Sequence, residues 1–154
     1  MAVTTQRAIY AGLLADIKSG ISAVHDDYIF ITPVPLFVQA DERIIQLIPG
    51  VPNVATEDVG LGLVEEDFRV VVWARVFLDQ QGHSTGRITD ATYGVMKTME
   101  LVRQVLIQSD ANGTSTIPVR WISGSTPQET PEAPGWVYYE DTYRIGYEIT
   151  WTVS

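Results

Sequence analysis

The chain has no cysteine and few histidines, which limits the disulfide, thiolate and metal chemistry that it can carry out. Its 154 residues include no cysteine and two histidines, His25 and His83. The absence of cysteine excludes a disulfide framework and thiolate chemistry. Metal sites need several convergent ligands, and His25 with its neighbours Asp26 and Asp27 is more typical of a solvated turn. The sequence therefore predicts neither a metal site nor a cofactor.

Clustered positive charge and long apolar runs are also missing. Ten Lys and Arg stand against nineteen Asp and Glu, which gives a net charge of −9 at pH 7. Proteins that grip nucleic acid need clustered Lys and Arg, so we expect DNA to pass this chain without binding to it. No apolar run approaches the roughly 18 residues of a membrane span, and the N-terminus lacks a signal-peptide pattern. We expect the protein to be made and to fold in a cytoplasm.

What the chain does have is a long, apolar strand pattern over residues 68–79. Twelve residues at about 3.3 Å each reach roughly 40 Å, whereas a chain of this length has a radius of gyration of roughly 15 Å. The odd positions also carry apolar residues, namely Val71, Trp73 and Phe77. We therefore predict that a neighbouring subunit covers this second face, with these three as subunit-interface residues. The even positions are wholly apolar and are predicted to face a core: Phe68, Val70, Val72, Ala74, Val76 and Leu78.

Two helices and several strands are predicted around this strand. Thr4 or Thr5 can cap a first helix that ends near Lys18, and apolar residues recur at helical spacing over 88–107. Residues 36–40 and 44–48 have the spacing of a hairpin, and strict alternation over 143–153 is typical of a half-buried antiparallel strand.

The order of these elements predicts one α+β domain over residues 1–154. We expect a mostly antiparallel sheet with two helices packed on one face. Long loops are predicted near residues 49–63 and 123–135, where Pro and Gly gather.

Candidate chemistry is sparse. The run Glu65-Glu66-Asp67 and the pair Glu140-Asp141 could do acid/base work at suitable separation, but solvated strand ends explain them more simply. His83 and Ser84 precede a helix without the residues of a phosphate-binding loop. We predict no catalytic residues. Large aromatic side chains more often fill a core or an interface than a ligand pocket, and the candidates are Trp73, Phe77, Trp121, Trp136 and Trp151.

The layout resembles that of the tail terminator (tail completion) proteins of long-tailed bacteriophages. These proteins begin with a helix, continue through short strands and then carry a segment similar to residues 68–79. A polar loop and a helix comparable to residues 88–107 follow. A strand like Val119-Arg120-Trp121, a variable loop and a strand like residues 143–151 close the chain.

The resemblance implies a structural role in the virion neck. Proteins of this family form a hexameric ring on the growing end of the tail tube, stop its polymerisation and join the tail to the head. The implied partners are further copies of the chain, the tail tube protein and a head-completion or neck protein. DNA passes through the ring, and neither catalysis nor a cofactor is involved. From the net charge, and not from the resemblance, we expect Glu65, Glu66 and Asp67 to face the DNA channel.

Two other interpretations stay open at this point. The chain could be a head-completion or adaptor protein on the portal side of the neck. It could also belong to another class, as a small α+β ligand-binding domain or enzyme that uses its aromatic residues and His83.

Overall fold

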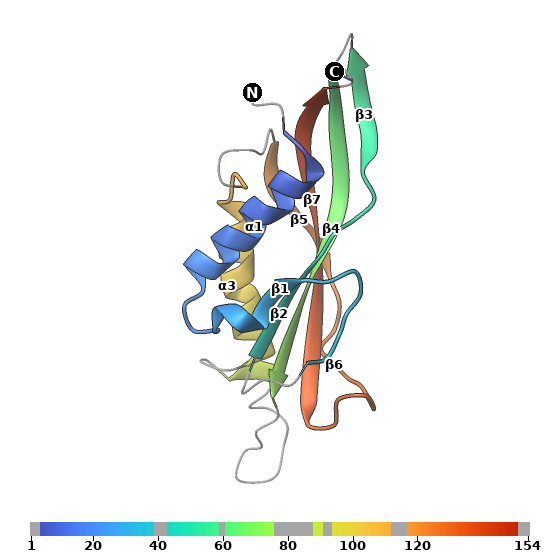
Figure 1. The fold of residues 1–154 in the computed structure, drawn as a ribbon. Coiled ribbons are helices and arrows are strands. Elements are labelled where there is room, and N and C mark those ends of the chain that lie inside the picture. Colours follow the sequence, from blue (N-terminus) through green and yellow to red (C-terminus); the bar gives the residue numbers. More distant parts are fainter. Residues whose placement is uncertain are drawn as a thin grey trace.

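The computed structural model describes residues 4–38, 43–58, 61–75, 88–90, 94–111 and 117–150. In these residues a mostly antiparallel sheet carries two helices on one face, which confirms the predicted α+β class (Figure 1). The elements are α1 (Gln6–Gly20), a 3-10 turn (Asp26–Tyr28), β1 (Ile29–Ile31), β2 (Arg43–Ile48), β3 (Asn53–Asp58), β4 (Leu61–Arg75), α3 (Val95–Ile107), β5 (Ile117–Gly124), β6 (Gln128–Glu129) and β7 (Trp136–Thr150).

Strands β4 and β7 form the spine of the sheet. Each has 15 residues, and they pair antiparallel along their whole length, from Leu61 opposite Thr150 to Arg75 opposite Trp136. The strand order is β1-β2-β4-β7-β5, with β3 beside β4 and β6 beside β7, and only β1 and β2 are parallel. The long predicted strand is thus present, but it begins at Leu61 and not at Phe68. Residues 76–79 lie outside the described part of the chain.

Both predicted long loops contain strands, so those two predictions are wrong in part. Residues 49–63 include β3 and the start of β4, and residues 123–135 include the end of β5 and all of β6. Pairing with the long strands β4 and β7 satisfies the backbone there and overrides the weak strand propensity of Gly and Pro. The predicted hairpin is wrong as well, because residues 36–38 form no strand.

The two helices follow from capping and apolar spacing. The Thr5 hydroxyl accepts a hydrogen bond from the Ala8 N–H at 3.1 Å and so starts α1. Ile9, Leu13 and Ile17 form its fully buried stripe. In α3 the buried stripe is Val95, Met99, Val102 and Leu106. The helix predicted over 88–107 is divided, because residues 88–89 are helical, residue 90 is not, and α3 begins at Val95; residues 91–93 lie outside the described part of the chain.

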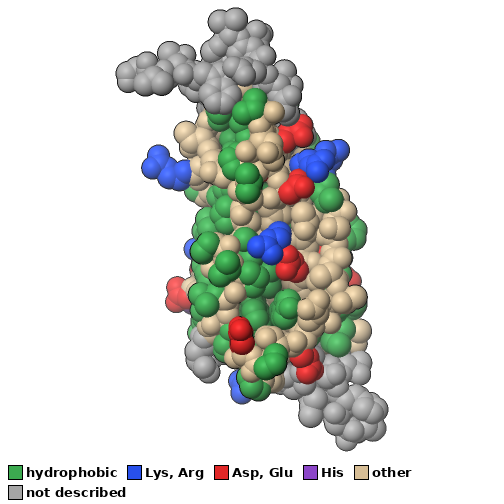
Figure 2. All heavy atoms as spheres, turned by 90° about the vertical axis from the view of Figure 1, so that its right-hand side faces the viewer, with side chains coloured by type: hydrophobic (Ala, Val, Ile, Leu, Met, Phe, Trp, Pro, Cys, Tyr) green, Lys and Arg blue, Asp and Glu red, His purple; other side chains and the backbone are tan. Residues whose placement is uncertain are grey.

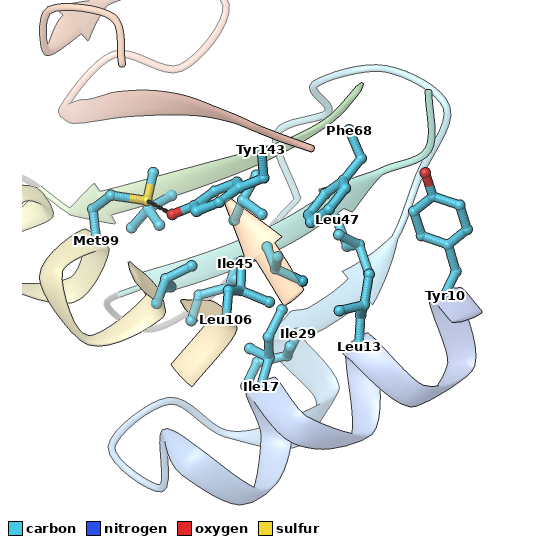
Figure 3. Packing of buried hydrophobic residues seen from close by; sticks show 14 of the residues in the cluster. Tyr10, Leu13, Ile17, Ile29, Ile45, Leu47, Phe68, Met99, Leu106 and Tyr143 are labelled. Atoms are coloured by element: carbon cyan, nitrogen blue, oxygen red, sulfur yellow. Dashed lines mark hydrogen bonds between the residues drawn. The ribbon is translucent and has the colours of Figure 1, made fainter. Parts of the chain in front are cut away.

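The main core lies between the helices and the sheet (Figure 3). The even-numbered residues of β4 point into it, as predicted, with Phe68 at its centre. The Phe68 ring stacks on Tyr143 at a centroid distance of 5.5 Å and meets the Tyr10 ring edge-on at 6.0 Å. These aromatic contacts hold α1, β4 and β7 together.

The opposite face of the sheet, called here the outer face, is partly covered by the chain itself. Val71 is fully buried and Trp73 is 3% exposed, in a cluster with Ile44, Ile48, Ala133 and Trp136. Phe37 packs on the Trp73 ring at 5.7 Å. The expectation that a neighbouring subunit covers Val71 and Trp73 is therefore wrong, because segments before β2 and before β7 already do so. Phe77 lies outside the described residues.

Candidate interaction surface

The acidic run of β4 splits between the two faces of the sheet. Side chains alternate along a strand, so Glu66 points toward the helices while Glu65 and Asp67 point outward. Glu66 is 1% exposed. Its carboxylate accepts hydrogen bonds from the Tyr10 hydroxyl, from the Tyr147 hydroxyl at 3.1 Å and from the Gln6 amide at 3.2 Å. The prediction that Glu66 faces a channel is therefore wrong, since its charge is enclosed beneath α1.

This enclosed cluster shifts the titration of its tyrosines. Burial raises the pKa of the Tyr10 hydroxyl well above its ordinary value, and the hydrogen bond to Glu66 raises it further. Burial also raises the pKa of Tyr147, and the Glu66 charge adds to the effect. The Tyr10 hydroxyl in turn accepts from the Gly50 N–H at 3.1 Å. The cluster thus ties α1 to β4, β7 and the segment after β2.

On the outer face, Asp67 and Arg144 form a two-point ion pair. The Arg144 Nε and Nη2 donate to the two Asp67 oxygens at 2.7 and 3.2 Å. These hydrogen bonds lower the pKa of Asp67. An open pocket of about 580 Å³ adjoins the pair, and Glu65 lies in its lining. Val51 and Asn53 also line the pocket, and Glu66 borders it too, although its carboxylate lies on the other face of the sheet.

Charges of both signs alternate over the rest of this surface. Arg69 donates to Glu140 at 2.9 Å, and the register places Arg120 of β5 directly opposite Arg144 of β7. Figure 2 shows Lys or Arg and Asp or Glu side chains side by side on this side of the molecule, among apolar ones. Over the described residues, the outer face therefore carries charges of both signs side by side, and these residues form no continuous basic track for nucleic acid.

Asp141, which the sequence placed at a solvated strand end, is fully buried under α3. Arg103 donates to its two oxygens at 2.6 and 2.9 Å, and the Tyr143 hydroxyl donates at 2.9 Å. The Arg103 guanidinium also lies 4.2 Å from the ring centre of Trp121. The sequence analysis did not predict that Arg103 binds a buried carboxylate. Its place in α3, directly after Val102 of the buried stripe, could have indicated that its side chain lies near the sheet.

Exposed apolar side chains lie at two places along the edges of the sheet, near β3 and on β5. Val51 is 75% exposed and Val54 is 51% exposed on the β3 side, whereas Trp121 and Ile122 are 46% and 44% exposed on β5. Apolar side chains at a sheet edge make these two edges candidates for contact with another chain.

Candidate sites for chemistry find no support in the part of the chain that the structure describes. There, no group of three or more His, Asp or Glu side chains could hold a metal ion. His25 is exposed, and its Nδ1 accepts from the Asp27 N–H at 3.1 Å, as expected for a turn. His83 and Trp151 lie outside the described residues. No described helix is long and apolar enough to cross a membrane.

Comparisons with known proteins give matches among solved structures alone. No protein-family model and no curated protein matches the chain. Among solved structures, a chain from the virion of a native gene transfer agent particle matches with a TM-score of 0.55 and 15% sequence identity. The match covers 93% of this chain and 93% of that one. The fold described above is thus similar to that of a chain in the virion of a gene transfer agent particle.

Proposed function

We propose that this protein is a structural component of a phage-type virion and acts in the neck as a tail terminator. The observation that carries the proposal is the match to a virion chain over nearly the full length of both chains. In this role the protein forms a hexameric ring on the end of the tail tube. The ring stops tube growth and joins the tail to a head-completion protein.

The charge distribution supports a ring that lets DNA pass. The outer face mixes the acids Glu65, Asp67 and Glu140 with arginines that pair two of them. We propose that this face lines the channel, with Glu65 and Asp67 as channel residues. Such a surface, on a chain of net charge −9, does not attract the phosphates of duplex DNA and so lets the DNA move through the ring.

The proposed role needs no catalysis and no cofactor. Both buried carboxylates, Glu66 and Asp141, are used in holding helices to the sheet. We therefore propose a protein that works by assembly alone, with further copies of itself, the tail tube protein and a neck protein as partners.

Tail tubes assembled in the presence of the purified chain test this function. The expected result is shorter tubes of uniform length, each closed at one end by a ring visible in negative-stain images. Light scattering after size exclusion gives the subunit number of the free ring. A chain that stays monomeric at high concentration and leaves tube length unchanged would contradict the proposal. Cross-linking to a portal-side protein, and not to the tube, would favour the adaptor role.

A further inference from the structure

Across the sheet, four strands follow one another in the order β3-β4-β7-β5. They share the level of Glu65 and Gly146, from which β3 extends one way along residues 61–65 of β4 and β5 extends the other way along residues 141–146 of β7. Within the described residues, neither β3 nor β5 has a second strand beside it. A free strand edge presents unpaired backbone N–H and C=O groups, which another strand can satisfy.

The directions of the four strands allow copies to continue the sheet. Each neighbouring pair in this row is antiparallel. Strands β3 and β5, at the two ends of the row, therefore run in opposite directions. If β5 of one copy lies beside β3 of the next, the new pair is antiparallel as well, and the pattern repeats unchanged. Such a head-to-tail contact closes into a ring when the rotation between copies permits.

Arg120 gives the β5 edge a positive charge that no ion pair with another described residue neutralises. It is exposed and lies directly opposite Arg144, whose own partner is Asp67. Like charges directly opposite in a sheet are destabilising. Asp67 is near enough for Arg120 to lower its pKa, but among the described residues no carboxylate lies within 4.0 Å of Arg120. A carboxylate from another chain, placed beside Arg120, would offset the repulsion between Arg120 and Arg144.

The opposite edge carries the complementary charge. Glu65 is half-buried on the outer face, directly opposite Asn53 of β3, and lies in the open pocket. It forms no ion pair within 4.0 Å among the described residues. Arg120 is the charged residue in the sequence of β5.

We propose that β5 of one copy pairs with β3 of the next, and that Arg120 reaches over Asn53 to form an ion pair with Glu65. Two strand spacings of about 4.8 Å separate the backbones of such residues, which two long side chains can bridge. The contact also covers the apolar side chains exposed at both edges. This inference rests on the proposed ring and names its subunit contact.

Engineered disulfides test the contact, since the natural chain has no cysteine. The double variant Asn53→Cys, Arg120→Cys should give a ladder of covalent oligomers on mild oxidation, up to the full ring. Within one chain these positions lie three strand spacings apart, roughly 14 Å, which is too far for a disulfide. The control pair Asn53→Cys, Arg7→Cys, with Arg7 exposed on α1, should give no ladder. Each single-cysteine variant alone should form no covalent dimer, and a disulfide-linked dimer from either would mean a symmetric contact and overturn the proposal.

Charge reversal tests the ion pair. Arg120→Glu and Glu65→Arg should each raise the protein concentration needed for half assembly by about tenfold or more, because like charges then meet at the interface. The double variant Arg120→Glu, Glu65→Arg should return it close to the natural value. Arg7→Glu, which makes the same change of charge on α1, should leave assembly unchanged.

The outcomes separate this contact from the function on which it rests. A ring that forms without the ladder, or with no recovery in the double reversal, would overturn the contact and leave the ring intact. A chain that stays monomeric and gives no ladder at any concentration would overturn both.

Discussion

Glu66 and Asp141 lie under different helices and hold them to the same face of the sheet by different means. Glu66 accepts from the neutral donors of Tyr10, Tyr147 and Gln6, whereas Asp141 accepts two hydrogen bonds from the Arg103 guanidinium. A buried carboxylate whose donors are removed keeps the full penalty of desolvation. Each carboxylate therefore makes the position of one helix depend on a few named side chains.

Arg103→Met should destabilise the protein strongly. The substitution keeps much of the aliphatic stem but leaves Asp141, which has no exposed surface, without its cation. Breaking a buried pair from one side costs about 3–5 kcal/mol, so the free energy of unfolding in urea should fall by about that amount. Lys97→Met, on the same helix, should change it by no more than about 0.5 kcal/mol. An equally small loss in Arg103→Met would show that Asp141 does not depend on Arg103.

High pH should also destabilise the fold, through its buried tyrosines. The pKa values of Tyr10, Tyr143 and Tyr147 are all raised in the folded state, with burial as the largest cause. A raised folded pKa gives stability that is complete below the unfolded pKa of about 10 and is lost as the pH rises above it. Above that pH the unfolded chain binds fewer protons than the folded one, so stability falls by about 1.4 kcal/mol per pH unit for each such tyrosine.

Urea unfolding between pH 8 and pH 11 measures this slope. The variant Tyr143→Phe removes one of the titrating groups. Above pH 10 its free energy of unfolding should therefore fall less steeply, by about 1.4 kcal/mol per pH unit, whatever the effect of the substitution at neutral pH. A fall of the same steepness in this variant would mean that other groups cause the alkaline unfolding.

Among the elements, the segment from Thr32 to Val38 is held in an unusual way. It crosses the outer face without joining the sheet, and the Gln46 side chain takes the place of a neighbouring strand. The Gln46 amide accepts from the Leu36 N–H at 3.1 Å and donates to the Leu36 carbonyl. Its oxygen also accepts from the Trp73 indole N–H at 3.0 Å. One fully buried side chain thus fixes the cover over Trp73.

Gln46→Leu should release this segment while the sheet stays folded. The leucine keeps the apolar contacts of the position but satisfies neither backbone group of Leu36. We expect hydrogen exchange of the Leu36 amide to quicken by about tenfold, as for a loss of about 1.4 kcal/mol in local stability. The amides of α1 should exchange as before. Gln128→Leu, which removes the acceptor of the Tyr138 hydroxyl elsewhere on this side, is the matched control. Unchanged exchange at Leu36 would show that packing alone holds the segment.

The same elements show what the sequence could predict. Strict alternation in β4 predicted its core face, and the apolar stripes of α1 and α3 predicted both helices, because each pattern is local and has a fixed period. Alternation could not predict what covers the outer face, since that depends on Phe37 and Trp136, which are distant in the sequence. The alternation could have predicted that Glu66 points toward the core, because Glu66 and Phe68 are two residues apart and so lie on the same face of the strand. The expectation that Glu66 faces a channel was based on net charge and did not take this alternation into account.

At the scale of the whole molecule, the two faces of the sheet have different character. The helices cover one face, and Figure 1 shows both on the same side of the long strands. The other face holds the ion pairs Asp67–Arg144 and Arg69–Glu140. If copies join edge to edge as proposed, the sheets form a continuous wall with all helices on one side of it. The helix-free face is then the one that can line a channel.

Cysteine labelling in the assembled ring should reveal this orientation. Thr142→Cys places a thiol on the outer face, opposite Arg69, and Gln104→Cys places one on the exposed side of α3. With the channel on the outer face, a bulky polyethylene-glycol maleimide should modify position 142 much more slowly than N-ethylmaleimide does. Position 104 should react quickly with both, because it faces the outside of the ring. In unassembled protein both positions should accept the bulky reagent, which controls for local burial. Slow bulky labelling at position 104 instead, with position 142 open, would reverse the assignment and place the helices in the channel.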